Sequence, residues 1–284
     1  MLTESRSFRK LVRLMFRVKG LRVVAHALRR RLARPESVWI DDFDGDLAFL
    51  CRLDEHIGSQ MYWRGAYSWS QLRVLDRLLQ PDMVFADVGA NQGEFTLFAA
   101  KRLPRGRVLA FEPMTEMRER LVGNLAANPF DNVLVSDRGL WSEPGRRRIF
   151  RRDAPFADGS FHEGLGTLFP TAERSDAVEE IALTTLDAFL EQQGIDRVDV
   201  LKVDVEGAEL EVLRGAEKTL ERCRPLLLLE ADRDCAEAAG GGLEALLGWL
   251  APRYRFERVG ASGRTRAVEP AALGRHQDLL CIPR

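Results

Sequence analysis

The stretch VFADVGANQGEFT, residues 84–96, gives the strongest indication of the fold. It begins with an apolar run typical of a short buried strand and continues into a segment with helical character. Asp87 stands at the tip of the apolar run, and Gly89 and Gly93 follow it. Glycine lets the backbone turn tightly and approach a ligand closely. The stretch therefore predicts a strand, a glycine loop and a helix around a ligand site.

Strand and helix patterns alternate along the chain after residue 68. Short, continuously apolar runs predict buried strands at residues 84–88, 108–111, 133–136, 198–203 and 226–229. Helices are predicted between them at residues 95–102, 114–127 and 210–222. This alternation predicts a parallel, doubly wound α/β sheet, which binds ligands beyond the carboxyl ends of its strands.

Three segments lie outside this alternation. Residues 255–259 and 278–282 predict two further strands near the C-terminus. Residues 144–176 contain several glycines and prolines and predict a long irregular excursion. Excursions of that length inside a compact domain are either functional loops or disordered segments.

The composition limits the possible classes of protein. A chain of 284 residues with 45% hydrophobic residues can bury one substantial core, and its net charge of -1 indicates no nucleic-acid partner. The four cysteines form no CxxC pair, which argues against a zinc site and a disulfide framework and suits a reducing compartment. No apolar run approaches the ~20 residues of a membrane span, so we predict a cytoplasmic protein.

Two carboxylates accompany the predicted glycine loop. Gly89 and Gly93 are four residues apart, unlike the GxGxxG loop that binds a pyrophosphate, and Asp87 would repel phosphate. Glu112 ends the second predicted strand, where an acidic side chain accepts hydrogen bonds from ribose hydroxyls. A nucleoside with a cationic, amino-acid-like arm fits these residues. We therefore predict S-adenosylmethionine as the cofactor, with Asp87 toward its ammonium group and Glu112 toward its ribose.

Five motifs resemble one family, namely DVGANQG, FEP, TLDAFL, LKVDVEGAELEVLRGA and LLLLE at residues 87–93, 111–113, 185–190, 201–216 and 226–230. They are similar to those of the FkbM family of S-adenosylmethionine-dependent methyltransferases. The resemblance runs from about residue 57 to DLLCIP at residues 278–283. It implies a Rossmann-like seven-stranded methyltransferase sheet, mostly parallel with an antiparallel last strand, with helices on both faces and an N-terminal helical extension. It also implies O-methylation, often of a sugar hydroxyl of a glycan or glycosylated metabolite.

The resemblance assigns expected roles to parts of the chain. Residues 81–284 are the expected methyltransferase domain, preceded by a cap region at residues 36–80 and a basic amphipathic segment at residues 1–35. The expected cofactor contacts are Asp87, Gly89, Ala90, Asn91, Gly93 and Glu112. The sequence departs from the family at residues 139–142, GLWS, where members commonly carry an acidic adenine contact. Trp141 and Ser142 are therefore the candidates for contact with the base.

The predicted fourth strand carries the candidate catalytic residues. Lys202 and Asp204 are two residues apart and so point to the same face of the strand, near the cofactor cleft. Their pairing is either structural or catalytic. Methyl transfer needs an aligned nucleophile and a group that takes the hydroxyl proton. We predict Asp204 as that base and Lys202 as the group that keeps it ionised, while Glu230 either pairs with Lys202 or binds substrate.

Other polar and aromatic residues have two interpretations each. His162 either contacts substrate, acts as the base or is a solvated loop residue, and Glu209 is either structural or part of the site. The remaining histidines have no ligand-like partners in the sequence, so no metal site is predicted. The aromatic residues before the fold either stack on sugar rings or cover the core; these are Tyr62, Trp63, Tyr67 and Trp69.

The N-terminal segment forms a predicted amphipathic helix. Phe8, Leu11, Val12 and Met15 fall on one stripe, and Arg9, Arg13 and Arg17 fall on another. Such a helix docks on the domain, on a partner chain or on an anionic membrane surface.

Two other functions compete with methyl transfer. A nicotinamide-dependent oxidoreductase is disfavoured by the glycine spacing and by Asp87. A non-catalytic binding module with a methyltransferase-like fold is disfavoured by the joint presence of Asp87, Glu112, Lys202 and Asp204.

Overall fold

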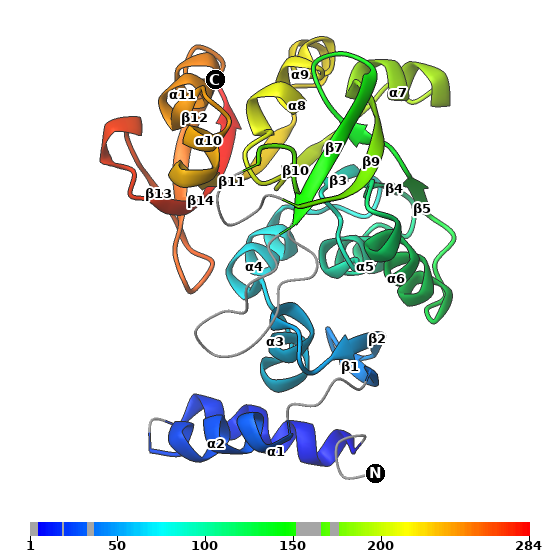
Figure 1. Ribbon diagram of the computed structural model, residues 1–284, viewed down its shortest axis with the longest axis vertical. Helices are drawn as coiled ribbons and strands as arrows, with labels where there is room; N and C mark the ends of the chain where they lie inside the picture. Colours follow the sequence, from blue (N-terminus) through cyan, green and yellow to red (C-terminus); the bar gives the residue numbers. More distant parts are fainter. Residues whose placement is uncertain (1–4, 19, 33–36, 152–165, 171–175) are drawn as a thin grey trace.

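The computed structural model describes residues 5–18, 20–32, 37–151, 166–170 and 176–284 (Figure 1). Its largest sheet in this part of the chain has eight strands, in the order β13-β12-β14-β11-β10-β3-β4-β5. These are β3 (Val84–Val88), β4 (Arg107–Phe111), β5 (Val133–Ser136), β10 (Val200–Val203), β11 (Leu226–Asp232), β12 (Tyr254–Val259), β13 (Thr265–Ala267) and β14 (His276–Pro283). Strands β11, β10, β3, β4 and β5 run parallel, and β14 lies antiparallel between β11 and β12. The predicted fold class is confirmed, and β13 is a short edge strand beyond the seven that were expected.

The central strands are buried on both faces, which explains their continuous apolar sequences. Phe85 packs in one hydrophobic cluster, whereas its neighbours Ala86 and Val88 pack in another on the opposite face. The first cluster includes residues of α4 (Trp69–Leu78), α5 (Glu94–Arg102) and α6 (Thr115–Ala126). The second includes residues of α7 (Leu186–Gln193), α8 (Glu209–Arg214), α9 (Glu217–Cys223), α10 (Arg233–Ala238) and α11 (Gly242–Leu250).

The predicted helix at residues 210–222 is two helices in the structure. Helix α8 ends at Arg214 and α9 begins at Glu217. A Cβ atom on Gly215 would lie 2.0 Å from the carbonyl oxygen of Trp141, so the chain passes very close to another segment at this break. The Asp187 carboxylate then accepts hydrogen bonds from the backbone N–H groups of Lys218 and Thr219, each 2.9 Å long. These bonds satisfy the free donors at the start of α9.

The excursion predicted as irregular at residues 144–176 contains strands. A second sheet has the order β6-β9-β7-β8, formed by β6 (Gly139–Leu140), β7 (Gly145–Arg151), β8 (Gly166–Thr167) and β9 (Asp176–Thr184). Antiparallel pairing between β7 and β9 joins the two ends of the excursion. A third hydrophobic cluster joins Ile149 and Ile181 of this sheet to Met117 of α6. His162 falls outside the described residues.

The N-terminal elements form a separate layer at one end of the molecule (Figure 1). They are α1 (Arg6–Arg17), α2 (Arg22–Leu32), the antiparallel pair β1 (Ser37–Phe43) and β2 (Leu47–Arg52), and α3 (His56–Arg64). The short helix η1 (Pro270–Ala272) lies near the other end of the chain. The boundaries of the three predicted segments remain predictions.

Two arginines of α1 attach it to β1, which corrects the predicted arginine stripe. Arg9 is 1% exposed, and its Nε lies 3.1 Å from Oδ1 of Asp42. Nη1 of Arg13 donates to Oδ2 of the same carboxylate over 2.9 Å. Leu11 was expected on the docked stripe but is 57% exposed. Helix α1 therefore docks through Arg9, Arg13 and Val12 and leaves Leu11 on its free side.

Candidate active site

The glycine loop lies across the carboxyl ends of β3, β4 and β10. The backbone N–H groups of Gly89 and Ala90 donate to the Phe111 carbonyl oxygen at the end of β4, over 3.1 and 3.0 Å. Gly89 has φ 78°, and a Cβ atom there would lie 1.9 Å from the carbonyl oxygen of Asp204. Only glycine fits this position, because it combines a left-handed conformation with backbone contact. The loop is therefore packed directly against the residue predicted as the base.

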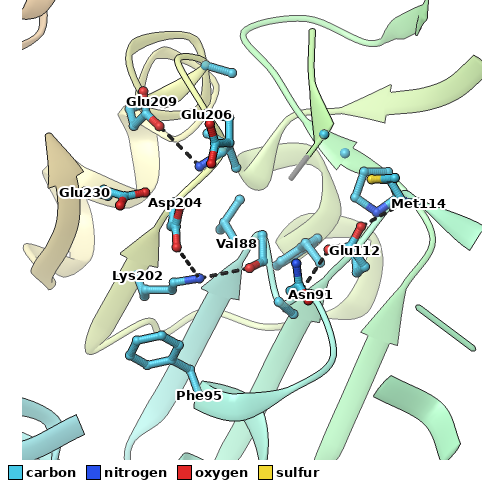
Figure 2. A pocket seen from close by; sticks show the side chains of 18 of the residues that line it. Val88, Asn91, Phe95, Glu112, Met114, Lys202, Asp204, Glu206, Glu209 and Glu230 are labelled. Carbon is cyan, nitrogen blue, oxygen red and sulfur yellow. Dashed lines mark hydrogen bonds and ion pairs between the residues drawn. The ribbon is translucent and has the colours of Figure 1, made fainter. Parts of the chain in front are cut away.

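A cavity of about 530 Å³ opens beside this loop, within the size range of small-molecule sites (Figure 2). It lies beyond the carboxyl ends of the parallel strands, as the sequence predicts. Seven of the predicted site residues line it, namely Gly89, Ala90, Asn91, Glu112, Lys202, Asp204 and Glu230. The second sheet adds an apolar wall that includes Leu140, Ile149 and Leu183, which the sequence analysis did not find.

Glu112 is held by backbone donors at the cavity wall. Its Oε2 accepts from Asn91 N over 2.8 Å, and its Oε1 accepts from Met114 N over 2.9 Å (Figure 2). Burial raises the pKa of Glu112 to about 7, although the two backbone bonds favour its charged form. The carboxyl group therefore changes charge close to neutral pH.

Asp87 does not line the cavity among the residues that the structure describes, so its predicted contact with the cofactor's ammonium group has no support. Its side chain is completely buried. Oδ2 accepts from the hydroxyl group of Thr96 over 2.6 Å, and Oδ1 lies 3.3 Å from Nζ of Lys202. Asp87 thus lies on the side of β3 that α5 covers, and it contacts the site through Lys202.

Lys202 is buried and contacts both the glycine loop and Asp204. Its Nζ donates to the Gly89 carbonyl oxygen over 2.9 Å and lies 3.4 Å from Oδ2 of Asp204. The ammonium group also lies 4.8 Å from the centre of the Phe95 ring. Burial alone would lower the pKa of Lys202, but the carboxylates of Asp87 and Asp204 outweigh burial and raise it. Lys202 therefore stays charged and cannot itself accept a proton.

Asp204 and Glu230 form a coupled pair on neighbouring strands. Partial burial would raise the pKa of Asp204, but Lys202 and a hydrogen bond from Glu230 hold it below its ordinary value. The charge on Asp204, followed by burial, raises the pKa of Glu230 well above its ordinary value. These opposite shifts favour the state in which Asp204 is charged and Glu230 carries a proton that it donates to the Asp204 carboxylate. Nζ of Lys202 thus lies within ion-pair distance of Asp87 and Asp204, and Glu230 interacts with Asp204.

The strand pairing of β11 and β14 adds further ionisable groups at the cavity. The register places Glu230 opposite Asp278 and Asp232 opposite His276. Nε2 of His276 lies 3.4 Å from Oε1 of Glu230, and its Nδ1 lies 3.1 Å from Oδ2 of Asp232. Burial raises the pKa of Asp278 to about 6. Antiparallel pairing thus brings His276 close to Glu230 and Asp232, which are distant from it in the sequence.

Two groups among the described residues have a spacing that could hold a metal ion. Glu230, His276 and Asp278 form one, and Asp204, Glu206 and Glu230 form the other, each with potential ligand atoms within 4.8 Å of one another. His276 therefore has carboxylate partners in the structure, whereas the prediction of no metal site assumed that the histidines have none.

The predicted adenine contacts and Gly93 lie away from the cavity. Within the described part of the chain, its lining includes Leu140 but neither Trp141 nor Ser142. The Trp141 ring packs under the Arg147 guanidinium, 4.4 Å away, and the Ser142 hydroxyl donates to Glu211. A Cβ atom on Gly93 would meet Cδ1 of Leu121 at 2.5 Å, so this glycine serves helix packing.

The remaining ambiguous residues divide between core and cavity. Tyr62 and Trp63 are buried in the core. Tyr67 lines the cavity, whereas Trp69 does not appear among the described lining residues. Glu209 also lines the cavity, but its Oε1 accepts from the backbone N–H groups of Val205 and Gly207, each over 3.2 Å. Glu209 therefore holds the turn before α8.

Comparison with known proteins places this chain among methyltransferases. Residues 87–257 match the family model described as the methyltransferase FkbM domain. AMB antimetabolite synthetase AmbE of Pseudomonas aeruginosa is 31% identical over 219 residues, which cover 63% of this chain and 10% of that protein. The 31-O-demethyl-FK506 methyltransferase FkbM of Streptomyces tacrolimicus is 35% identical over 165 residues, which cover 49% of this chain and 61% of that protein.

A third relative is the hexuronic acid methyltransferase AglP of Haloferax volcanii. It is 31% identical over 150 residues, which cover 53% of this chain and 56% of that protein. The chain thus spans less than two thirds of the length of each of these relatives.

Proposed function

The chain belongs to the FkbM methyltransferase family, and we propose that it transfers a methyl group from S-adenosylmethionine to a hydroxyl group of a sugar or sugar-bearing acceptor. The observation that carries this proposal is the carboxylate of Asp204, which stands beside the glycine loop and opens into the cavity with 34% of its side chain exposed.

The residues around the loop fit the cofactor. The Gly89 position has no room for a Cβ atom, so backbone atoms border the cavity where a ligand would lie. Asn91 and Glu112 would face its ribose, and Glu112 can accept hydrogen bonds from hydroxyl groups when ionised. When bound, S-adenosylmethionine supplies an electrophilic methyl group on a positively charged sulfur. The carboxylates that line the cavity favour that positive charge.

Asp204 would orient the acceptor hydroxyl and take its proton. The proton of that hydroxyl would pass to Asp204 as its oxygen takes the methyl group that the bound cofactor would supply. Lys202 and Glu230 keep Asp204 a weak base, so Asp204 accepts the proton only as the oxygen becomes acidic in the transition state. Glu230 links Asp204 to His276, which is 55% exposed and offers the proton a way to solvent.

The cavity also favours certain acceptors. Tyr67 presents an aromatic side chain at the cavity, a common partner of sugar rings. Asp232 and Asp278 place negative charge at the cavity and oppose a negatively charged acceptor. AglP is named for a hexuronic acid, which carries a carboxylate. We therefore propose a neutral or amine-bearing sugar as the acceptor of this chain.

Calorimetric titration and product analysis test this function. We expect binding of S-adenosylmethionine and S-adenosylhomocysteine but not of NAD. A panel of neutral, amine-bearing and carboxylate-bearing sugars should then show methylation on oxygen, with the carboxylate-bearing sugars slowest. Binding of NAD in place of S-adenosylhomocysteine would contradict the cofactor. A methyl group found on nitrogen or carbon would contradict the hydroxyl acceptor.

A further inference from the structure

The helical pair α1 and α2 exposes an unusual number of large apolar side chains. We call six of them the N-terminal face: Leu11, Leu14, Val18, Leu21, Val23 and Val24, all exposed. Leu14 is 56% exposed and Val23 is 74% exposed. Groups of exposed apolar residues on a folded protein typically mark an interaction site.

The orientation of α1 is fixed by its opposite side. Arg9 and Val12 are each 1% exposed, and Arg9 is paired with Asp42 under the helix. Phe8, Met15 and Phe16 pack against the same core. Leu11 and Leu14 are three residues apart, which places them on one stripe of α1, and Val18 follows directly after the helix. That stripe is the side that the core does not cover.

The charged side chains that the two helices themselves carry are all of one sign. Residues 5–32 contain no aspartate or glutamate. The exposed cations of the two helices include Arg6, Lys10, Arg22 and Arg31. Apolar side chains bordered by arginine and lysine are the pattern of a helix that lies in the interface of an anionic membrane. No helix among the described residues is long and apolar enough to cross a membrane.

We propose that the N-terminal face binds the surface of an anionic lipid membrane. The apolar side chains enter the boundary between headgroups and acyl chains, while the arginines and lysine contact lipid phosphates. A second copy of the chain is a poorer occupant, because a two-fold contact would bring the same basic residues of both copies together. This surface is separate from the cavity, so the proposal does not depend on methyl transfer.

Flotation with lipid vesicles tests the proposal. We expect the full chain to float with vesicles of phosphatidylglycerol and phosphatidylcholine but not with phosphatidylcholine alone. Raised salt should weaken the binding, because screening shortens the reach of exposed charges to ~3 Å at 1 M. Equal binding to both vesicle types, or binding that salt leaves unchanged, would overturn the basic part of the proposal.

A matched pair of double variants distinguishes the contribution of the apolar side chains to vesicle binding from that of the net charge. Leu14→Glu with Val23→Glu should lower the vesicle partition coefficient at least about tenfold, because two inserting side chains become charged. Val122→Glu with Val178→Glu makes the same charge change at side chains that are 49% and 40% exposed elsewhere. It should stay within about threefold of the unmodified chain, since two added charges act only through the long-range field. Circular dichroism and melting confirm that both variants fold.

Two outcomes of the variant pair would refute the inference. If both variants lose binding equally, net charge and not the N-terminal face carries the attraction. If the unmodified chain does not float and sediments as a dimer that Leu14→Glu with Val23→Glu converts to a monomer, the face pairs two copies of the chain.

Discussion

Substitutions at Asp204 and Glu230 test whether these residues act as a coupled acid pair. Asp204→Asn removes the proposed base, and we expect the turnover rate to fall by roughly 10²- to 10⁴-fold, the usual contribution of a general base. At 1.36 kcal/mol per tenfold, that loss corresponds to about 2.7 to 5.4 kcal/mol of barrier. Cofactor binding should persist, because the contacts of Glu112 do not involve Asp204.

Glu230→Gln should be much milder than Asp204→Asn. The charge of Asp204 favours the protonated form of Glu230, and a glutamine amide can donate the same kind of hydrogen bond without carrying charge. We therefore expect a turnover rate within about tenfold of the unmodified enzyme at neutral pH, with a normal response to S-adenosylhomocysteine. The direct measurement is single-turnover methyl transfer beside calorimetric binding.

The double variant shows the coupling most clearly. The charge of Asp204 is the largest cause of the raised pKa of Glu230, so Asp204→Asn should return that pKa toward its ordinary value. Glu230 then ionises and can accept the proton, which gives Asp204→Asn a partial recovery of rate as pH rises. Adding Glu230→Gln should abolish the recovery. The coupling is refuted if the double variant keeps the pH profile of Asp204→Asn. If Glu230→Gln alone is as slow as Asp204→Asn, then Glu230 is the base.

Two further predictions concern the cofactor side. Burial raises the pKa of Glu112 to about 7, and only its charged form is a strong acceptor for ribose hydroxyls. The protein should therefore bind S-adenosylhomocysteine more tightly as pH rises through 7. Calorimetry from pH 6 to 8 should show this increase in affinity, and Glu112→Gln should remove it. Gly89→Ala should abolish cofactor binding and lower the melting temperature, because the new Cβ would lie 1.9 Å from the Asp204 carbonyl oxygen. The control Gly123→Ala adds a Cβ with nothing within 4 Å, so it should leave cofactor binding unchanged and keep or slightly raise the melting temperature. Equal behaviour of the two alanine variants would contradict the close packing of the loop.

The strands around the cofactor side were predictable because burial on both faces leaves a clear pattern. The run before Gly89 is apolar at nearly every position, and β3 begins and ends where the pattern predicts. Strand β7 was missed because its sequence, GRRRIFR, is rich in arginine and its side chains are mostly exposed. Its stability comes from backbone pairing with β9, which no local pattern reveals.

The positions of Asp204 and Glu112 beside the cavity were predictable, because each follows directly after its own strand. The role of a residue was not predictable where it forms an ion pair with a side chain that is distant in the sequence. Asp87 looks like a ligand for an ammonium group from the sequence, and the structure supplies that ammonium group from Lys202, its register partner on β10. His276 likewise meets Glu230 and Asp232 only through the antiparallel entry of β14.

The second sheet has a consequence for changing the acceptor by protein engineering. Its strands pair with one another and not with the central sheet. Ile149 and Leu183 pack in a hydrophobic cluster with Met114 and Met117, and both line the cavity, whereas Leu140 packs with the central sheet. A library that varies Ile149 and Leu183 therefore reshapes one wall of the cavity without substituting the glycine loop, Lys202 or Asp204. The shape of the cavity can thus be evolved from a sheet that carries none of the proposed catalytic residues.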